Sequence, residues 1–210
     1  MKTPDITLIL TLILLFLLPP ASAQRREDVL KPYDGPSVRG ADPSTLTGKV
    51  MTGYQGWFNC EGDGADLGWT HWARNRSKIF GPDNVTVDFW PDVSDYDDDE
   101  LYTTAFAYED GTRAKTFSSH NRKTVIRHFK WMADYGIDGA FVQRFTHSLR
   151  DNTRRYHKDK VLSSTREGAN RHGRTYAVMY DLTGMPDRRL LEVFDDWRML
   201  RNKMHITEDP

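Results

Sequence analysis

The chain has 210 residues, with 29 Lys and Arg against 30 Asp and Glu and a net charge of −1 at pH 7. Because the opposite charges are balanced and interspersed, the composition gives no reason to expect nucleic acid or an anionic membrane as a partner. The single cysteine, Cys60, excludes an internal disulfide. The length suits one domain or a piece of a larger one.

The amino terminus has the pattern of a secretory signal peptide. Lys2 precedes an apolar run over residues 6–18, and Ala21-Ser22-Ala23 gives the small-x-small pattern that signal peptidase recognises. A membrane-spanning helix needs about 20 apolar residues, which is longer than this run. We therefore expect a signal peptide over residues 1–23, a secreted or periplasmic product, and no membrane contact after cleavage.

The first structured segment is expected at residues 49–54, a short strand that follows an extended N-terminal arm over residues 24–46. Residues 83–89 alternate apolar and polar side chains, which is the period-two pattern of a second strand. The acidic, turn-rich sequence after them predicts a long loop as far as Phe117.

Helices and strands alternate over the rest of the chain. The patterns predict, in chain order, a helix from Ser118 or Ser119 to Gly136, a strand over 137–145, a helix within 148–173 ending at Gly173, a strand over 175–184, and a helix starting at Pro186. The stripe on the last helix predicts a buried face of Leu190, Leu191, Phe194, Trp197, Leu200 and Met204. This alternation predicts an α/β fold with parallel strands. It does not decide between a barrel and an open doubly wound sheet.

Polar and aromatic side chains gather just after the predicted strands, at the edge where a β/α barrel places its active site. Aromatic rings stack on the C–H faces of sugars, while polar side chains bond the hydroxyls at the ring edge. We therefore expect a carbohydrate cleft lined by Tyr54, Gln55, Trp57, His71, Trp72, Asp88, Trp90, Gln143, Arg144, Tyr180 and Asp181.

Several of these residues also have a purely structural interpretation. Trp57 is consistent with packing over a barrel end, and His71 with a hydrogen-bonded loop histidine. Asp88 and Asp181 are typical of caps, and Arg144 of an ion pair. No Gly-x-Gly-x-x-Gly turn follows a strand and no metal-ligand spacing occurs, so we expect no cofactor and no metal.

Five segments in order carry a family resemblance: GYQGWFNCEGDG, GWTHW, VDFWPDVSDYD, FSSHNRKTVIRHFKWMADYGIDGAFVQRF and YAVMYDLTG. The chain from residue 48 to about 204 resembles glycoside hydrolase family 71/99-like proteins. Some of these are labelled xylosidase/arabinosidase, and they are related to the family 99 endo-α-mannosidases. The resemblance implies a (β/α)8 barrel of TIM type that hydrolyses glycosidic bonds. It also implies that Tyr54 and Trp57 line the sugar site, with His71, Gln143, Arg144 and Tyr180 near it.

The sequence departs from that family in its carboxylates. Family 99 enzymes carry their paired catalytic glutamates in the second half of the barrel, and glycoside hydrolysis needs two carboxyls at a fixed separation. No such pair stands at a predicted strand end here: after the signal segment the glutamates are Glu27, Glu61, Glu100, Glu109, Glu167, Glu192 and Glu208.

These features favour a truncated hydrolase-like protein whose residues 47–210 form about the first four β/α units. By itself it is expected to be inactive, its catalytic residues are unidentified, and its open sheet edges favour self-association. The alternatives are a non-catalytic carbohydrate-binding protein and an unrelated α/β binding module.

Overall fold

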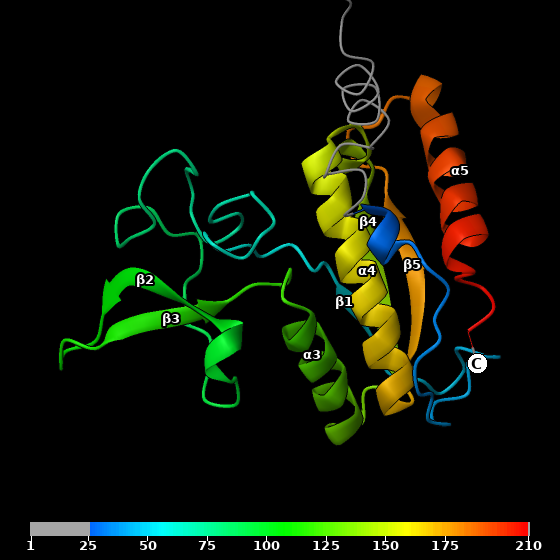
Figure 1. The fold of residues 1–210 in the computed structure, drawn as a ribbon, viewed down its shortest axis with the longest axis horizontal. Coiled ribbons are helices and arrows are strands. Elements are labelled where there is room, and N and C mark those ends of the chain that lie inside the picture. The colour runs from blue at the N-terminus through cyan, green and yellow to red at the C-terminus, as the bar shows by residue number, and fades with distance from the viewer. Residues whose placement is uncertain (1–25, 210) are drawn as a thin grey trace, which may run out of the picture.

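The computed structural model describes residues 26–209, which form a three-stranded sheet packed with helices and a separate two-stranded hairpin (Figure 1). In chain order the elements are β1 (Met51–Tyr54), the 3-10 turn η1 (Asp98–Glu100), β2 (Leu101–Ala107), β3 (Arg113–Phe117), α3 (Arg122–Asp134), β4 (Gly139–Phe145), η2 (Thr146–Arg150), α4 (Asn152–His172), β5 (Thr175–Asp181), η3 (Asp187–Arg189), α5 (Leu190–Met199) and the π-helical turn η4 (Leu200–Met204). The expected signal peptide lies outside the described residues.

The sheet is parallel, with strand order β1-β4-β5. Tyr54 lies opposite Val142, and Phe145 lies opposite Asp181, so the carboxyl ends of all three strands meet at one edge. Gly139 opens the central strand β4, where a Cβ would overlap the backbone of Thr175. The predicted α/β fold with parallel strands is therefore confirmed. Within the described residues the sheet is open, with β1 and β5 at its edges, and not a closed barrel.

Side chains and glycines fix the helix boundaries. Asn121 caps α3 and Asp151 caps α4, each by accepting a hydrogen bond from a backbone N–H in the first turn. The helix that the sequence placed after Ser118 or Ser119 therefore begins at Arg122. Gly173 ends α4 with φ +58°, the left-handed conformation that glycine adopts without strain, as its position predicted.

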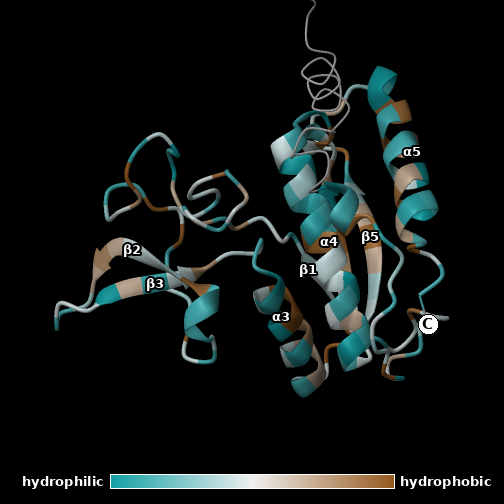
Figure 2. Ribbon diagram, viewed as in Figure 1, coloured by the Kyte–Doolittle hydropathy of each residue, from teal (hydrophilic) through white to brown (hydrophobic). Residues whose placement is uncertain are grey.

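The main core lies between the sheet and the helices. It is built from Leu30, Val125, Phe129, Met132, Ala140, Val142, Leu162, Ala169, Leu200, Met204 and Ile206. Phe129 of α3 packs at Gly168 of α4, where an added Cβ would meet the Phe129 ring at 3.1 Å, so glycine lets the two helices approach closely. Full burial of such a ring contributes about 1.5–3 kcal/mol. Figure 2 shows α4 mostly hydrophilic, because this helix turns polar side chains inward as well as outward, whereas β5 is hydrophobic over part of its length.

The strand predicted over residues 83–89 is wrong, and so is the predicted loop that β2 and β3 occupy. Val85 and Val87 do face one way, but they pack on a second cluster around Trp72 and Phe80. The backbone of this segment is hydrogen-bonded to a loop and not to a strand: Thr86 N donates to the Trp72 carbonyl at 2.9 Å. The alternating side chains therefore reflect packing on one side of the segment, without the hydrogen bonds of a β-sheet.

The predicted buried face of the last helix is confirmed for its second half. Leu200 and Met204 are fully buried and Trp197 packs on the main core, whereas Leu190, Leu191 and Phe194 are exposed, Leu191 by 71%. The inward-facing residue in the middle of α5 is Asp196, which reaches a buried arginine and holds the helix to the sheet by charge. The apolar residues of the first turns therefore face outward.

The arm before β1 is folded onto the domain. Residues 26–29 are helical and Leu30 joins the main core. Further along, Val38 N donates to the Asn170 carbonyl and Ala41 N to the Gly173 carbonyl, each at 2.8 Å, which fastens the arm to the end of α4. No helix between residues 26 and 209 is long and apolar enough to cross a membrane.

Candidate functional site

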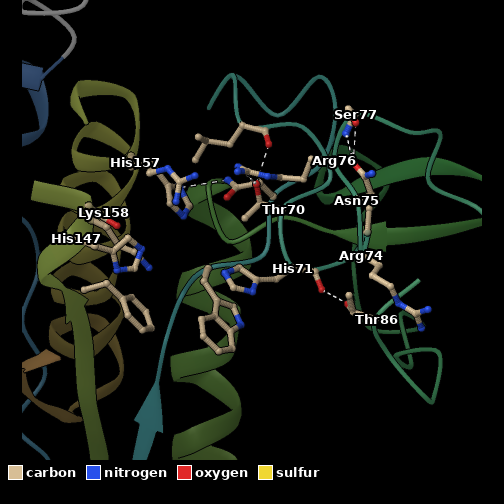
Figure 3. Close-up of a pocket in the computed structure, with 17 residues that line it drawn as sticks. Thr70, His71, Arg74, Asn75, Arg76, Ser77, Thr86, His147, His157 and Lys158 are labelled. Carbon is tan, nitrogen blue, oxygen red and sulfur yellow. Dashed lines mark hydrogen bonds between the residues drawn. The ribbon is translucent and has the colours of Figure 1, made fainter. Parts of the chain in front are cut away.

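A pocket of about 960 Å³ opens at the carboxyl edge of the parallel sheet (Figure 3). Three segments line it: the turn after β1 with Trp57 and Asn59, the loop that carries His71, and the joint between β4 and α4 with Phe145 and Lys158. Ligands of open α/β sheets bind in the crevice outside the carboxyl ends of the strands. The pocket thus lies at the edge where the sequence predicted a cleft.

Gly56 directs the chain from β1 into the pocket wall. It has φ +51°, and a Cβ at this position would overlap Cγ1 of Val161 on α4. Only glycine meets both conditions, because other L-residues are strained at positive φ and carry the overlapping carbon. The glycine between Tyr54 and Trp57 therefore serves to turn the next ring out of the strand and over the sheet edge.

Trp57 belongs to a stack of rings. The His71 ring is parallel to it within 18° at a centroid distance of 4.0 Å, and the Phe145 ring within 14° at 5.5 Å. His71 adopts φ +62°, a conformation that costs a non-glycine residue about 1–3 kcal/mol. Thr86 donates its hydroxyl to the His71 carbonyl and holds this turn in place. The stack is thus assembled from three distant segments at the cost of local strain.

A histidine and an amide form the floor of the pocket. His157 Nε2 lies 3.0 Å from the Gly56 carbonyl, which only accepts, so this nitrogen carries the proton. Its Nδ1 is then an acceptor, which lies 3.1 Å from His120 Nδ1 and 3.3 Å from Asn59 Nδ2. Burial, with Lys158 next, holds the pKa of His157 well below its usual range, which keeps the ring neutral. The Asn59 Oδ1 atom is buried and has no hydrogen-bond partner among the described residues.

Lys158 is a cation held against the pocket wall. Its residue is 8% exposed, its Nζ donates to the Gln55 carbonyl at 2.9 Å, and it lies 4.8 Å from the centre of the Phe145 ring. Burial, followed by the charge of Arg144, lowers the pKa of Lys158 from 10.5 to about 7. No carboxylate among residues 26–209 forms a salt bridge with it, so its charge is unbalanced.

The pocket has a positive electrostatic character. None of the described side chains that line it is an Asp or a Glu. The pKa of His71 is lowered to about 4, first by burial and then by the charges of Lys158, Arg76 and Arg154. The pKa of His147 is lowered by burial and by the same α4 cations. A neutral His71 is therefore the form that stacks on the tryptophan near neutral pH.

Of the eleven residues expected in the cleft, Trp57 and His71 line this pocket. Three other aromatic candidates are packing residues. Tyr54 donates to or accepts from His128 Nδ1 at 2.9 Å and packs on the main core. Trp72 is 2% exposed and donates to the Phe117 carbonyl, and Trp90 packs in the same second cluster.

Arg144 and Tyr180 are taken up by a buried charge network. Arg144 bonds Asp196 at 2.5 Å and Asp159 at 2.6 Å, and the Tyr180 hydroxyl donates to Asp196 at 2.7 Å. Arg26 completes the network by donating to Asp159 at 2.6 Å. Arg144 thus forms a structural ion pair, the alternative to a ligand-binding role at this strand end, and Tyr180 joins it through a hydrogen bond.

The remaining candidates lie outside the pocket lining. Gln143 donates to the Asp181 carboxylate at 2.6 Å, Asp88 is exposed, and Gln55 contributes a backbone carbonyl to Lys158. Sequence reasoning missed the lining residues Asn59, Thr70, Arg76, Phe145, His147, Arg154, His157 and Lys158. The run HSLRDNTRRYHK after a strand end held the signal for several of them, since it is basic and free of apolar side chains apart from Leu149 and Tyr156.

One group of carboxylates has oxygens close enough for a metal ion, formed by Asp97, Asp99 and Glu100. Lys123 bridges Asp97 and Asp99 at 2.6 and 2.8 Å, and Arg127 donates to Glu100. Two cations thus already offset most of the charge of the three carboxylates, and the group serves to join η1 to α3.

Comparison with known proteins gives a sparse picture. No family model matches this sequence, and no curated protein does. Among solved structures, the chain is similar to the GH99 endo-alpha-mannosidase from Bacteroides thetaiotaomicron, with 15% identity and a TM-score of 0.45. The match covers 79% of this chain and 42% of that one, so the chain spans less than half of that enzyme. Such a likeness does not establish a shared activity. The family resemblance of the sequence motifs stays a prediction.

Proposed function

We propose that the chain binds a carbohydrate in the pocket at the carboxyl edge of its sheet. The observation that carries this proposal is the His71–Trp57–Phe145 ring stack on a pocket of about 960 Å³. That volume is within the range of small-molecule sites and accommodates one or two sugar rings. Flat rings offer a surface for the C–H face of a pyranose, and the surrounding polar groups match its hydroxyls.

Asn59 supplies an independent reason to expect a hydroxylated ligand. An unpartnered buried carbonyl oxygen costs about 1–3 kcal/mol, and a sugar hydroxyl is a donor of the right kind to satisfy it. Thr70 and Ser148 also line the pocket and bring hydroxyls that both donate and accept. The pocket therefore combines ring surface with polar atoms of both kinds.

Bond cleavage is not proposed for the described lining residues. Glycoside hydrolysis uses two carboxyl groups around the scissile bond, and these side chains include neither Asp nor Glu. In the fuller form of the proposal the parallel sheet is part of a (β/α)8 barrel of a glycoside hydrolase-like protein, with the catalytic carboxyls supplied from outside this lining. The apolar run over residues 6–18 supports export as part of the same proposal.

Glycan-array screening followed by calorimetric titration with the best oligosaccharide tests the proposal. Trp57→Ala should weaken binding by about tenfold or more, because it removes the middle ring that holds His71 and Phe145 in the stack, and a lost ring surface is worth on the order of 1–3 kcal/mol. Phe89→Ala is the matched control, since Phe89 is 89% exposed and lies outside the pocket lining. If no glycan on the array binds, or if the Trp57→Ala variant binds as tightly as the parent chain, the chain is better explained as an unrelated α/β binding module.

A further inference from the structure

Basic side chains converge on the pocket from two directions. Figure 3 shows His157, Lys158 and His147 on the α4 side and Arg76 on the facing loop, with His71 between them, whereas Arg74 points away. Arg154 of α4 also lines the pocket. The cations come from segments far apart in sequence, so their convergence is a property of the fold and not of one basic run.

Neither Lys158 nor Arg76 forms a salt bridge with a carboxylate of the described residues, although several buried and half-buried arginines of the chain do. Arg144 and Arg166 each bond carboxylates directly, and so does the half-buried Arg127. By contrast, Arg76 bonds the Thr70 hydroxyl at 3.4 Å. Lys158 bonds backbone carbonyls only, within the part of the chain that the structure describes.

Arg154 is the member of the set that does contact a carboxylate among the described residues, but the contact is long. It lies 3.6 Å from Asp151, the helix cap, whose side chain already accepts from the Arg154 backbone N–H. Asp151 already serves the positive end of the α4 dipole, which leaves it less able to balance the Arg154 side chain. Arg76, Arg154 and the protonated form of Lys158 therefore face one cavity, and this raises the free energy of the empty site relative to a site that holds an anion.

We propose that the pocket takes an acidic sugar unit, whose carboxylate or sulfate group binds Lys158, Arg76 and Arg154 while its ring contacts the Trp57–His71 stack. This inference rests on the proposed function and narrows its ligand class. Guanidinium groups pair with carboxylate or sulfate oxygens through two parallel hydrogen bonds, and an ammonium acts as a point charge. The unpartnered Asn59 Oδ1 accepts from a hydroxyl of the same unit, which distinguishes a sugar acid from a bare anion.

Calorimetric titration of the chain with three oligosaccharides of equal length tests the proposal: an oligogalacturonate, a sulfated heparin fragment and a neutral manno-oligosaccharide. At least one acidic ligand should bind about tenfold or more tightly than the neutral one at about 0.01 M salt, and this advantage should shrink at about 0.15 M. The acidic ligand that binds better identifies the anionic group as carboxylate or sulfate.

Arg76→Gln and Arg154→Gln should each weaken the acidic ligand several-fold and leave the neutral one unchanged. Arg113→Gln is the matched control, because Arg113 is exposed, bonds a backbone carbonyl and lies outside the pocket lining. Circular dichroism of each variant confirms that the fold is retained, which the exposed position of Arg76 favours.

The outcomes separate this inference from the proposed function. Equal affinity for neutral and acidic ligands, with no effect of either arginine variant, would overturn the acidic specificity and leave carbohydrate binding standing. Absence of binding to every oligosaccharide would overturn both. If a short single-stranded DNA or inorganic sulfate competes as well as the acidic oligosaccharide does, the sugar assignment is wrong and the site is a general anion site.

Discussion

Gly56→Ala should destabilise the chain through two separate steric effects. Alanine at φ +51° costs about 1–2 kcal/mol, because its Cβ crowds the carbonyl in the left-handed region. The same carbon overlaps Cγ1 of Val161 and lies 3.3 Å from Cε1 of Tyr54, and overpacking of this kind costs about 1–3 kcal/mol. The free energy of unfolding should therefore fall by about 2–5 kcal/mol, and sugar binding should fall with it because Trp57 is displaced.

Urea unfolding of a double-mutant set measures the two contributions separately. In a Val161→Ala background the overlap is relieved, so Gly56→Ala should cost only the backbone term of about 1–2 kcal/mol. The difference between the two backgrounds gives the steric term. A loss below about 0.5 kcal/mol for Gly56→Ala alone, or an identical loss in both backgrounds, would refute this reasoning.

Three further predictions concern the buried residues around the site. Arg144→Met should destabilise the chain by about 3–5 kcal/mol, measured by urea unfolding, because it removes the central cation between the buried Asp159 and Asp196 and leaves Asp196 with only the Arg155 cation at 3.6 Å; a loss of ligand affinity without a loss of stability would contradict the network assignment. Trp72→Ala should cost about 3–5 kcal/mol in the same assay, as expected for a buried ring, and a near-neutral effect would return this residue to the ligand site. Lys158 should lose its proton as the pH rises through about 7, so affinity for an acidic oligosaccharide should fall across that pH. A Lys158→Gln variant should show no such fall. An affinity that does not change with pH in the parent chain would argue against contact between Lys158 and the ligand.

Acid sensitivity of folding follows from the buried histidine of α3. His128 bonds the hydroxyls of Tyr54 and Tyr96 at 2.9 and 2.8 Å, and burial lowers its pKa from 6.5 to about 4. Between these values the unfolded chain binds more protons than the folded one, so this stabilisation is present above pH 6.5 and is lost as the pH falls through about 4. A His128→Gln variant should lose part of this acid dependence in thermal unfolding. An unchanged dependence would place it on other groups.

The sequence predicted the parallel units of the fold because their signals are local. Gly136 and Gly173 end helices and are followed at once by apolar strands, so both joints could be placed to within a few residues. The β2–β3 hairpin was missed, since Leu101–Ala107 is stabilised by pairing with Arg113–Phe117 and by the cluster around Trp72, which no local pattern reports.

The sequence predicted the edge of the sheet at which the pocket lies, but not most of the residues that line it. The end of β1 with Trp57 was a sound choice, because glycine spacing signals the turn. Arg144 was misjudged because its partners Asp159 and Asp196 come from two later helices, and spatial pairing of this kind leaves no sequence spacing. Lys158 was overlooked as one member of a basic helix, although the fold buries it against Phe145.

The most direct test of the central claim is the location of a bound sugar on the chain by NMR. Backbone amide shifts of the isotope-labelled chain are recorded while an oligosaccharide from the binding screen is added. The largest shift changes should fall on the amides of Trp57, Asn59 and His71, with further changes on Phe145 and Lys158. The amide shifts of the exposed residues Leu191 and Phe194 of α5 should stay unchanged. Shifts that gather on α5 or the β2–β3 hairpin and spare the turn after β1 would contradict this claim.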